Sequence, residues 1–227
     1  MAQSKTQFGY RRHADQDRTG ASIAEHPVVV VGAGPVGLSL AIDLAQRGQS
    51  IVLLDDADRI GEGSRAICFS KRSLEYWDRL GIGQRMVDKG VVWSVGRIFH
   101  GASLLYQFNL LPEQGHRRPA FINLQQFHAE AYLVDRVQQL AAIDLRWRNK
   151  VTGLQQRNDH VVLTIETPDG PYRLGASYVV ACDGAKSSLR QMVGAEFAGK
   201  MFEDQFLIAD VRMTAEFPTE RWFWFDP

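Results

Sequence analysis

The sequence predicts an α/β fold built around a parallel sheet, and three stretches carry this prediction. Residues 28–31 are four consecutive valines, typical of a strand buried on both faces, and they lead straight into a glycine-rich turn and a helix. Residues 51–54 give a second apolar strand directly after that helix. Three short strands within residues 150–175 then replace the crossover helix that a plain doubly wound sheet would have.

The turn after the first strand has the spacing Gly-x-Gly-x-x-Gly. Gly32 allows the tight turn, Gly34 lets the backbone approach a diphosphate, and Gly37 lets the helix lie close to the strand. Pro35 suits the first helical turn, and Gly48 ends the helix. The helix N-terminus offers free N–H groups and a partial positive charge to the diphosphate. Because the same spacing also occurs in ordinary turns, the neighbouring residues decide its meaning.

An acidic residue ends the second strand. Asp55 follows Gly32 at roughly the 20-residue spacing at which a dinucleotide-binding unit places an acid for the ribose hydroxyls of adenosine. The alternative is a solvated strand-end carboxylate, and Asp56 is the second candidate for the ribose. Residues 27–55 therefore predict a dinucleotide-binding βαβ unit.

Composition limits the class of protein. The 227 residues suit one large domain, or one domain with part of a second, and a hydrophobic content of 45% is that of a globular protein. The formal net charge is zero, so neither nucleic acid nor a membrane is expected as a partner. No apolar run reaches the roughly 18 residues of a membrane span, and we expect no signal peptide. Cys68 and Cys182 form no zinc or redox motif, so we expect reduced thiols in a cytoplasmic protein.

The stretches around the βαβ unit predict a tail, a loop and a helix. Residues 1–25 are polar without an apolar period, and we expect a disordered tail. Residues 57–68 form a loop that carries Arg65, close to the expected diphosphate. A guanidinium there suits phosphate or ribose oxygens, and the alternative is a surface arginine. A helix is expected from about Ser70, with apolar positions Leu74, Trp77 and Leu80 and with Gly81 and Gly83 stopping it.

Residues 90–123 predict short strands. Apolar stretches alternate with glycine and proline turns, at residues 91–93, 96–99, 104–108 and 120–122. A plain NAD-type fold would alternate strands and helices here. We therefore interpret this segment as an antiparallel β insertion in the dinucleotide-binding domain.

A helix and a meander follow the insertion. Residues 125–140 have an apolar helical stripe, with Gln126 at the start, and the pattern alone favours a surface amide for Gln126. Residues 143–147 predict a third strand. The three short strands of residues 150–175, with a turn at 168–170, resemble the crossover of the glutathione-reductase type of FAD domain.

A strand at residues 178–182, which we expect to be buried, ends in Asp183-Gly184, and a short helix follows. Asp183 thus stands at the carboxyl end of a strand, where open α/β sheets bind ligands. The plainer interpretation is the N-cap of the helix, and one carboxylate can serve both roles. Residues 206–211 and 222–225 are expected as further strands. The second has four consecutive aromatics and would form an apolar edge if left uncovered.

These motifs together resemble the single-component class A flavoprotein monooxygenases. These are FAD-dependent aromatic hydroxylases, among them phenol-type hydroxylases and 3-(3-hydroxyphenyl)propionate hydroxylase. The resemblance covers roughly residues 26–227, and the Asp-Gly motif is its most specific part. Residues 123–126 are similar to the family segment whose glutamine contacts the cofactor, and helical register favours Gln126 over Gln125. The other matches are Gly32-x-Gly34-x-x-Gly37, Asp55, Arg65-Ala66 and Asp183-Gly184-x-x-Ser187-x-x-Arg190.

The resemblance implies a fold and a reaction. The fold is a Rossmann-like FAD-binding domain of the glutathione-reductase type with a β-meander crossover, plus part of an antiparallel β substrate domain. The reaction is hydroxylation of a phenolic or other aromatic small molecule by O₂, through a flavin C4a-hydroperoxide, with NAD(P)H as reductant. No side chain receives a catalytic role, because the chemistry is the cofactor's. The full-length form is expected to allow a homodimer.

The resemblance also implies roles for site residues. Gly32, Gly34 and Gly37 hold the FAD diphosphate. Asp55 holds the adenosine ribose. Arg65 and Gln126 contact the diphosphate and ribityl region, and Asp183 and Gly184 line the FAD channel.

The domain division follows from these assignments. Residues 26–194 are the FAD-binding domain, and residues 195–227 begin the substrate domain. The family's second motif, Gly-Asp followed by small residues and His, does not follow Asp183-Gly184, so we expect a fragment or a shortened gene product. The alternatives are an inactive dinucleotide-binding module and, less favoured by the meander and the Asp-Gly motif, an NAD-dependent dehydrogenase.

Overall fold

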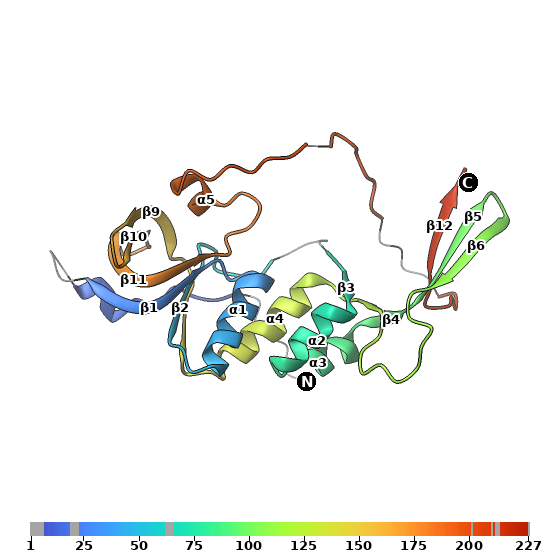
Figure 1. The fold of residues 1–227 in the computed structure, drawn as a ribbon, viewed down its shortest axis with the longest axis horizontal. Coiled ribbons are helices and arrows are strands. Elements are labelled where there is room, and N and C mark those ends of the chain that lie inside the picture. The colour runs from blue at the N-terminus through green and yellow to red at the C-terminus, as the bar shows by residue number, and fades with distance from the viewer. Residues whose placement is uncertain are drawn as a thin grey trace.

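The computed structural model describes residues 7–18, 23–61, 66–200, 202–209, 211 and 214–226. Its largest sheet has six strands, namely β1 (Ala24–Val31), β2 (Ile51–Leu54), β8 (Ile143–Arg146), β9 (Lys150–Gln156), β10 (Val161–Glu166) and β11 (Tyr172–Ala181). The strand order is β8-β2-β1-β11-β10-β9. Figure 1 labels β9, β10, β11, β1 and β2 of this sheet. β8, β2, β1 and β11 run parallel, and β9, β10 and β11 form an antiparallel meander. The predicted α/β fold with a meander crossover is confirmed.

Both faces of β1 are buried, as its valines predict. Val28 and Val30 lie in one apolar cluster with the helices, whereas Val29 and Val31 lie in a second cluster with the meander. The strand is central, since β2 and β11 pair with its two edges. The valine stretch therefore has no face or edge left for polar residues, whereas Glu25, near the start of β1, is exposed.

Helix α1 (Pro35–Gln46) lies on one face of this sheet, and α4 (Gln126–Val137) packs against α1. α3 (Gly83–Lys89) packs against α4, and α2 (Lys71–Arg79) packs against α3. α5 (Ser188–Met192) follows β11. Figure 1 shows α1 and α4 side by side, and their apolar residues Leu38, Ile42 and Leu133 are fully buried in the cluster on that face. None of the helices in the described part of the chain is long and apolar enough to span a membrane.

The strands predicted within residues 90–123 are present, and they belong to two small sheets. One contains β3 (Cys68–Ser70), β7 (Phe121–Asn123) and β4 (Val91–Trp93), with both pairings antiparallel. The other contains β12 (Arg221–Phe225), β5 (Val95–His100) and β6 (Ser103–Asn109). β5 and β6 form an antiparallel hairpin, but β12 runs parallel to β5, so this sheet is mixed.

Three expectations about individual elements are wrong. Gly81 ends α2 with a positive φ of 85°, but Gly83 begins α3 and does not end a helix. The third meander strand and the strand at 178–182 are one continuous strand, β11, and it is not buried throughout, since Tyr178 is 72% exposed. This exposure arises because β10 pairs with β11 only as far as Ala176. Residues 206–209 and 211 form no strand, since no strand among the described residues pairs with them.

The disordered tail expected at residues 1–25 is wrong for residues 7–18, which have defined contacts, and for Ala24 and Glu25, which begin β1. Residues 1–6 and 19–22 lie outside the described part. Asp15, in the short 3₁₀ helix η1 (Ala14–Asp17), binds Arg146 at 2.6 Å and His26 at 2.9 Å. The hydrogen bond from His26, together with the hydrogen bond and the charge of Arg146, holds the pKa of Asp15 well below its ordinary value. The polar composition of the segment thus reflects ion pairing with the sheet.

Asp144 also pairs with Arg146, and its titration should make the stability of the fold depend on pH. Burial alone would raise the pKa of Asp144, but the hydrogen bond from His13 and the charge of Arg146 lower it to about 2. A carboxyl group whose folded-state pKa is lowered stabilises the fold above its unfolded value of about 4 and loses that contribution as pH falls towards 2. We expect Asp144→Asn to cost about 1 kcal/mol at pH 7, because solvent screens this partly exposed group.

Thermal unfolding of the two proteins at pH 7, well above the unfolded-state pKa of about 4, and at pH 2.5, close to the folded-state pKa of about 2, measures this effect. The difference in melting temperature should be present at pH 7 and shrink at the acid pH. An equal difference at both values would show that the charge of Asp144 does not contribute.

Candidate cofactor site

The glycine-rich turn forms a close-packed corner with one open side. Gly32 has a positive φ of 106°, and a Cβ there would collide with the carbonyl of Cys182. A Cβ on Gly37 would collide with the carbonyl oxygen of Gly32. At Gly34, the N-cap of α1, a Cβ would meet no atom within 4 Å. Gly32 and Gly37 are therefore required by packing, whereas Gly34 leaves space in front of the helix N-terminus.

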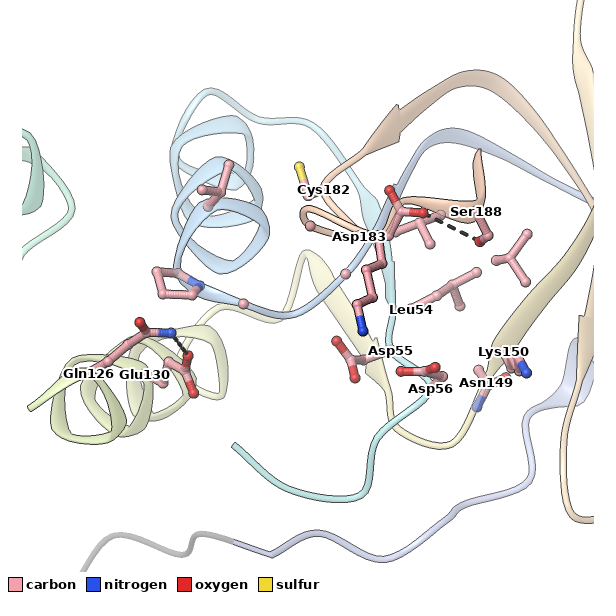
Figure 2. Close-up of a pocket in the computed structure, with 18 residues that line it drawn as sticks. Leu54, Asp55, Asp56, Gln126, Glu130, Asn149, Lys150, Cys182, Asp183 and Ser188 are labelled. Atoms are coloured by element: carbon pink, nitrogen blue, oxygen red, sulfur yellow. Dashed lines mark hydrogen bonds between the residues drawn. The ribbon is translucent and has the colours of Figure 1, made fainter. Parts of the chain in front are cut away.

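That space belongs to an open pocket of about 600 Å³ at the carboxyl ends of β1, β2 and β11 (Figure 2). Open parallel sheets bind ligands at this edge. The pocket is lined by Val31, Gly32, Gly34, Pro35, Val36, Leu54, Asp55, Asp56, Gln126, Glu130, Asn149, Lys150, Val151, Cys182, Asp183, Gly184, Lys186 and Ser188. A glycine-rich turn, a helix N-terminus and an acidic strand end thus face one space.

Asp55 is fixed on the pocket wall by its backbone and its side chain. Its N–H donates to the carbonyl of Arg146 at 3.0 Å, and its own carbonyl accepts from the N–H of Asn149 at 2.8 Å. Its carboxylate accepts hydrogen bonds from the N–H groups of Ala33 and Ala57. Burial raises the pKa of Asp55, and these hydrogen bonds only partly oppose the rise. The carboxylate is therefore poorly solvated, and it would gain from hydroxyl donors on a ligand.

Gln126 is the first residue of α4, and its side chain is held in place. Its Nε2 donates to Glu130 Oε1 at 2.7 Å, and Glu130 Oε2 accepts from the N–H of Gly61 at 2.6 Å (Figure 2). The free surface amide that the helical pattern favours is therefore wrong. Glu130, only 3% exposed, is a pocket residue that the sequence analysis missed. The signal in the sequence is its spacing: Glu130 comes four residues after Gln126, which places both side chains on the same face of the helix.

Asp183 caps the start of α5 while lining the pocket. Its Oδ2 accepts from the N–H of Leu189 at 3.1 Å and from Ser188 Oγ at 3.4 Å, although Ser187 is the N-cap residue itself. Burial acts to raise the pKa of Asp183, but the hydrogen bond from Ser187 and those from the helix N–H groups lower it. Gly184 follows with a positive φ of 83°, which places the turn beside the pocket.

The structure thus brings together Gly32, Gly34, Asp55, Gln126, Asp183 and Gly184 around one pocket. Gly37 lies behind the turn, against Gly32, and does not line the pocket. Arg65 lies outside the described residues. The polar pocket residues that the sequence did not single out are Glu130, Asn149, Lys150, Lys186 and Ser188.

Fold and site together define a class of protein. A βαβ unit with an open glycine cradle, an acid at the end of the second strand and a meander crossover are the features of an FAD-type dinucleotide-binding domain. The cradle fits a diphosphate, because the space beside Gly34 is free and the N-terminus of α1 faces it. The model of the FAD binding domain family matches residues 25–225, and the chain belongs to this family.

Individual relatives match over most of this chain. A "Flavin-dependent monooxygenase" of Mycobacteroides abscessus is 35% identical over 194 residues, which are 82% of this chain and 41% of that protein. A protein of Rhodococcus jostii named "Probable NADH-specific resorcinol 4-hydroxylase" is 28% identical over 206 residues, 88% of this chain and 38% of its own.

A solved structure is similar to this chain over most of its length. The crystal structure of p-nitrophenol 4-monooxygenase from Pseudomonas putida DLL-E4 has a TM-score of 0.74 and 28% identity, and the match covers 79% of this chain and 46% of that one. The chain spans about two fifths of the length of the curated relatives that it matches.

Proposed function

We propose that the protein is an FAD-dependent monooxygenase that hydroxylates a phenolic or other aromatic small molecule, with O₂ as co-substrate and NAD(P)H as reductant. The pocket that gathers the glycine cradle, Asp55 and Asp183 at one sheet edge carries the cofactor part of this proposal. The family match and the names of the relatives, which act on p-nitrophenol and resorcinol, support the reaction. The name of the resorcinol relative also supports a nicotinamide reductant.

The described side chains would bind and orient the cofactor. The backbone at Gly34 and the N–H groups of α1 would hold the diphosphate, and Asp55 would accept from the adenosine ribose hydroxyls. Gln126 would face the region between diphosphate and ribityl chain, with Asp183 and Gly184 on the opposite wall. Bound FAD supplies electron transfer from the nicotinamide to O₂, and the protein supplies position and exclusion of water.

Two further assignments belong to the proposal. Cys68 and Cys182 are both free thiols, which supports a reducing compartment, and we assign the protein to the cytoplasm. The division into residues 26–194 and a second domain from residue 195 stays a prediction, as does a homodimer of the full-length form. Light scattering of the purified protein measures the oligomeric state.

One assay on the purified protein tests the reaction. The protein is loaded with FAD, and NAD(P)H oxidation, O₂ consumption and product formation are followed with and without a panel of phenols. A phenol-stimulated oxidation that yields a hydroxylated ring supports the proposal. A protein that binds NADH but no flavin would instead be a dehydrogenase, and one that binds FAD without any reaction would be a binding module.

Asp55→Asn should weaken FAD binding while leaving the fold intact. The amide keeps one oxygen for the N–H of Ala33 or Ala57 but loses the charge that strengthens bonds to ribose hydroxyls, which are worth about 1.5–3 kcal/mol each. Titration with FAD and with FMN measures the effect. The affinity for FAD should fall. The affinity for FMN should not change, because FMN has no adenosine. Equal losses for the two flavins would contradict the ribose assignment.

A further inference from the structure

The N-terminal segment, residues 7–18, is attached to the two loops that form one end of the pocket. The ring of Phe8 stacks on Trp147 with centroids 4.7 Å apart, and the N–H of Phe8 donates to the carbonyl of Asp58 at 2.6 Å. Gln7 pairs with Arg59 in an antiparallel bridge. The segment therefore contacts both the loop after β2 and the loop after β8.

These two loops hold each other and carry the end of the pocket where Asp55 lies. The N–H of Asn149 donates to the carbonyl of Asp55, and the N–H of Arg148 donates to the carbonyl of Ala57 at 2.9 Å. Asp55 and Asn149 both line the pocket, and Figure 2 shows them near one another with Asp56. A shift of either loop would therefore move the carboxylate assigned to the ribose.

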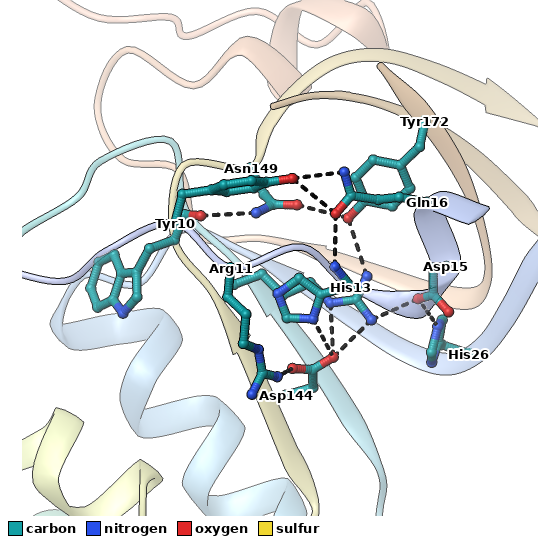
Figure 3. A network of polar contacts seen from close by, with 11 residues as sticks. Tyr10, Arg11, His13, Asp15, Gln16, His26, Asp144, Asn149 and Tyr172 are labelled. Carbon is teal, nitrogen blue, oxygen red and sulfur yellow. Dashed lines mark hydrogen bonds and ion pairs between the residues drawn. The ribbon is translucent and has the colours of Figure 1, made fainter. Parts of the chain in front are cut away.

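A buried chain of side chains makes a second connection from the segment to the same place. Asp15 accepts from Arg146, Arg146 donates to Tyr172 Oη at 3.1 Å, and Tyr172 donates to Asn149 Oδ1 at 2.8 Å. Figure 3 shows this network between the N-terminal segment and the ends of the strands. Asn149 is 1% exposed and its Nδ2 donates to the carbonyl of Trp147, so its side chain has a partner at both ends. Buried networks with all members satisfied are rigid.

We propose that residues 7–18 brace the adenosine end of the cofactor pocket, and that Phe8 and Asp15 are positioning residues that set the affinity for the adenosine half of the dinucleotide. The inference rests on the proposed function, in which this end of the pocket receives adenosine. Neither residue lines the pocket, so each acts through a neighbour, Trp147 or Arg146. Without the contacts of residues 7–18, the two loops would be less ordered before the dinucleotide binds. Binding would then have to order them, and the entropy lost would reduce the affinity.

The test compares the dissociation constants of FAD and ADP, since ADP carries only the adenosine diphosphate part. Phe8→Ala removes the stack, and Tyr172→Phe removes only the hydroxyl that joins Arg146 to Asn149. We expect each variant to raise both dissociation constants by about tenfold, the usual size of coupling between contacting groups. Phe8→Tyr, which keeps an aromatic ring against Trp147, should restore the affinity.

A control separates positioning from general stability. Met86 is fully buried in α3 and does not line the pocket, so Met86→Ala should lower the melting temperature and leave both affinities unchanged. Titrations run well below the lowest melting temperature of the set. Unchanged affinities in Phe8→Ala and Tyr172→Phe overturn the brace, and so does an equal loss of affinity in Met86→Ala. If the unaltered protein binds neither FAD nor ADP, the assignment of this pocket as the cofactor site is wrong, and the positioning role of residues 7–18 is wrong as well.

Discussion

Gly34→Val should reduce FAD affinity by about 100-fold without unfolding the protein, because it fills the space assigned to the diphosphate at a cost of about 3 kcal/mol. Gly34 has a φ of −77° and a ψ of −177°, an extended conformation that valine also adopts. A Cβ there meets no atom of the protein within 4 Å apart from its chain neighbours, so the side chain starts in the free space in front of the helix N-terminus. Fluorescence titration with FAD, together with a melting curve, measures both quantities.

Gly37→Ala is the matched control for this prediction. Its Cβ would strike the carbonyl oxygen of Gly32 inside the turn, so the helix must shift away from the strand. We expect it to lose about 1–3 kcal/mol of stability and to weaken FAD binding as a consequence. Gly34→Val, in contrast, should lose FAD affinity and keep its stability. If Gly34→Val binds FAD as the unaltered protein does, the diphosphate lies elsewhere.

Arg146→Met should destabilise the fold by about 3–5 kcal/mol, the usual cost of removing one partner from a buried ion pair. Arg146 is only 3% exposed and contacts Asp15 at 2.6 Å, Asp144 at 2.8 Å and the hydroxyl of Tyr172. Methionine fills similar volume but leaves both carboxylates without their shared cation. Urea unfolding followed by circular dichroism measures the loss.

Arg97→Met provides the comparison, since Arg97 binds Glu220 at 2.7 Å in a more exposed place. Ion pairs near the surface contribute little net stability, so this variant should unfold close to the unaltered protein. Equal losses of stability in Arg146→Met and Arg97→Met would show that the burial of Arg146 does not increase its contribution to the stability of the fold.

The parts of the fold that local chemistry decides could be predicted from the sequence. The valines of β1 have no polar face, which leaves only a doubly covered strand. The glycine positions follow from backbone geometry that no other residue allows, as at Gly32. The pocket residues Asp55, Asp183 and Gly184 come directly after strands, so strand prediction also places them at one edge.

The parts that depend on distant partners could not be predicted. Asp15 meets Arg146 across 131 positions, so a polar N-terminus was interpreted as disorder. Glu130 accepts from Gly61 across 69 positions, so its spacing from Gln126 indicates a shared helical face but not its burial. The exposure of Tyr178 depends on where β10 stops pairing, which the apolar run does not encode.

Hydrogen–deuterium exchange of the protein with and without saturating FAD locates the cofactor most directly. Backbone N–H groups in the glycine turn, the Asp55 loop and the start of α5 should exchange more slowly with FAD, because these three segments surround the pocket. The β5–β6 hairpin, which contributes no pocket residue, should not change. Protection confined to that hairpin, or no protection of the glycine turn at saturating FAD, would contradict the assignment of this pocket as the FAD site.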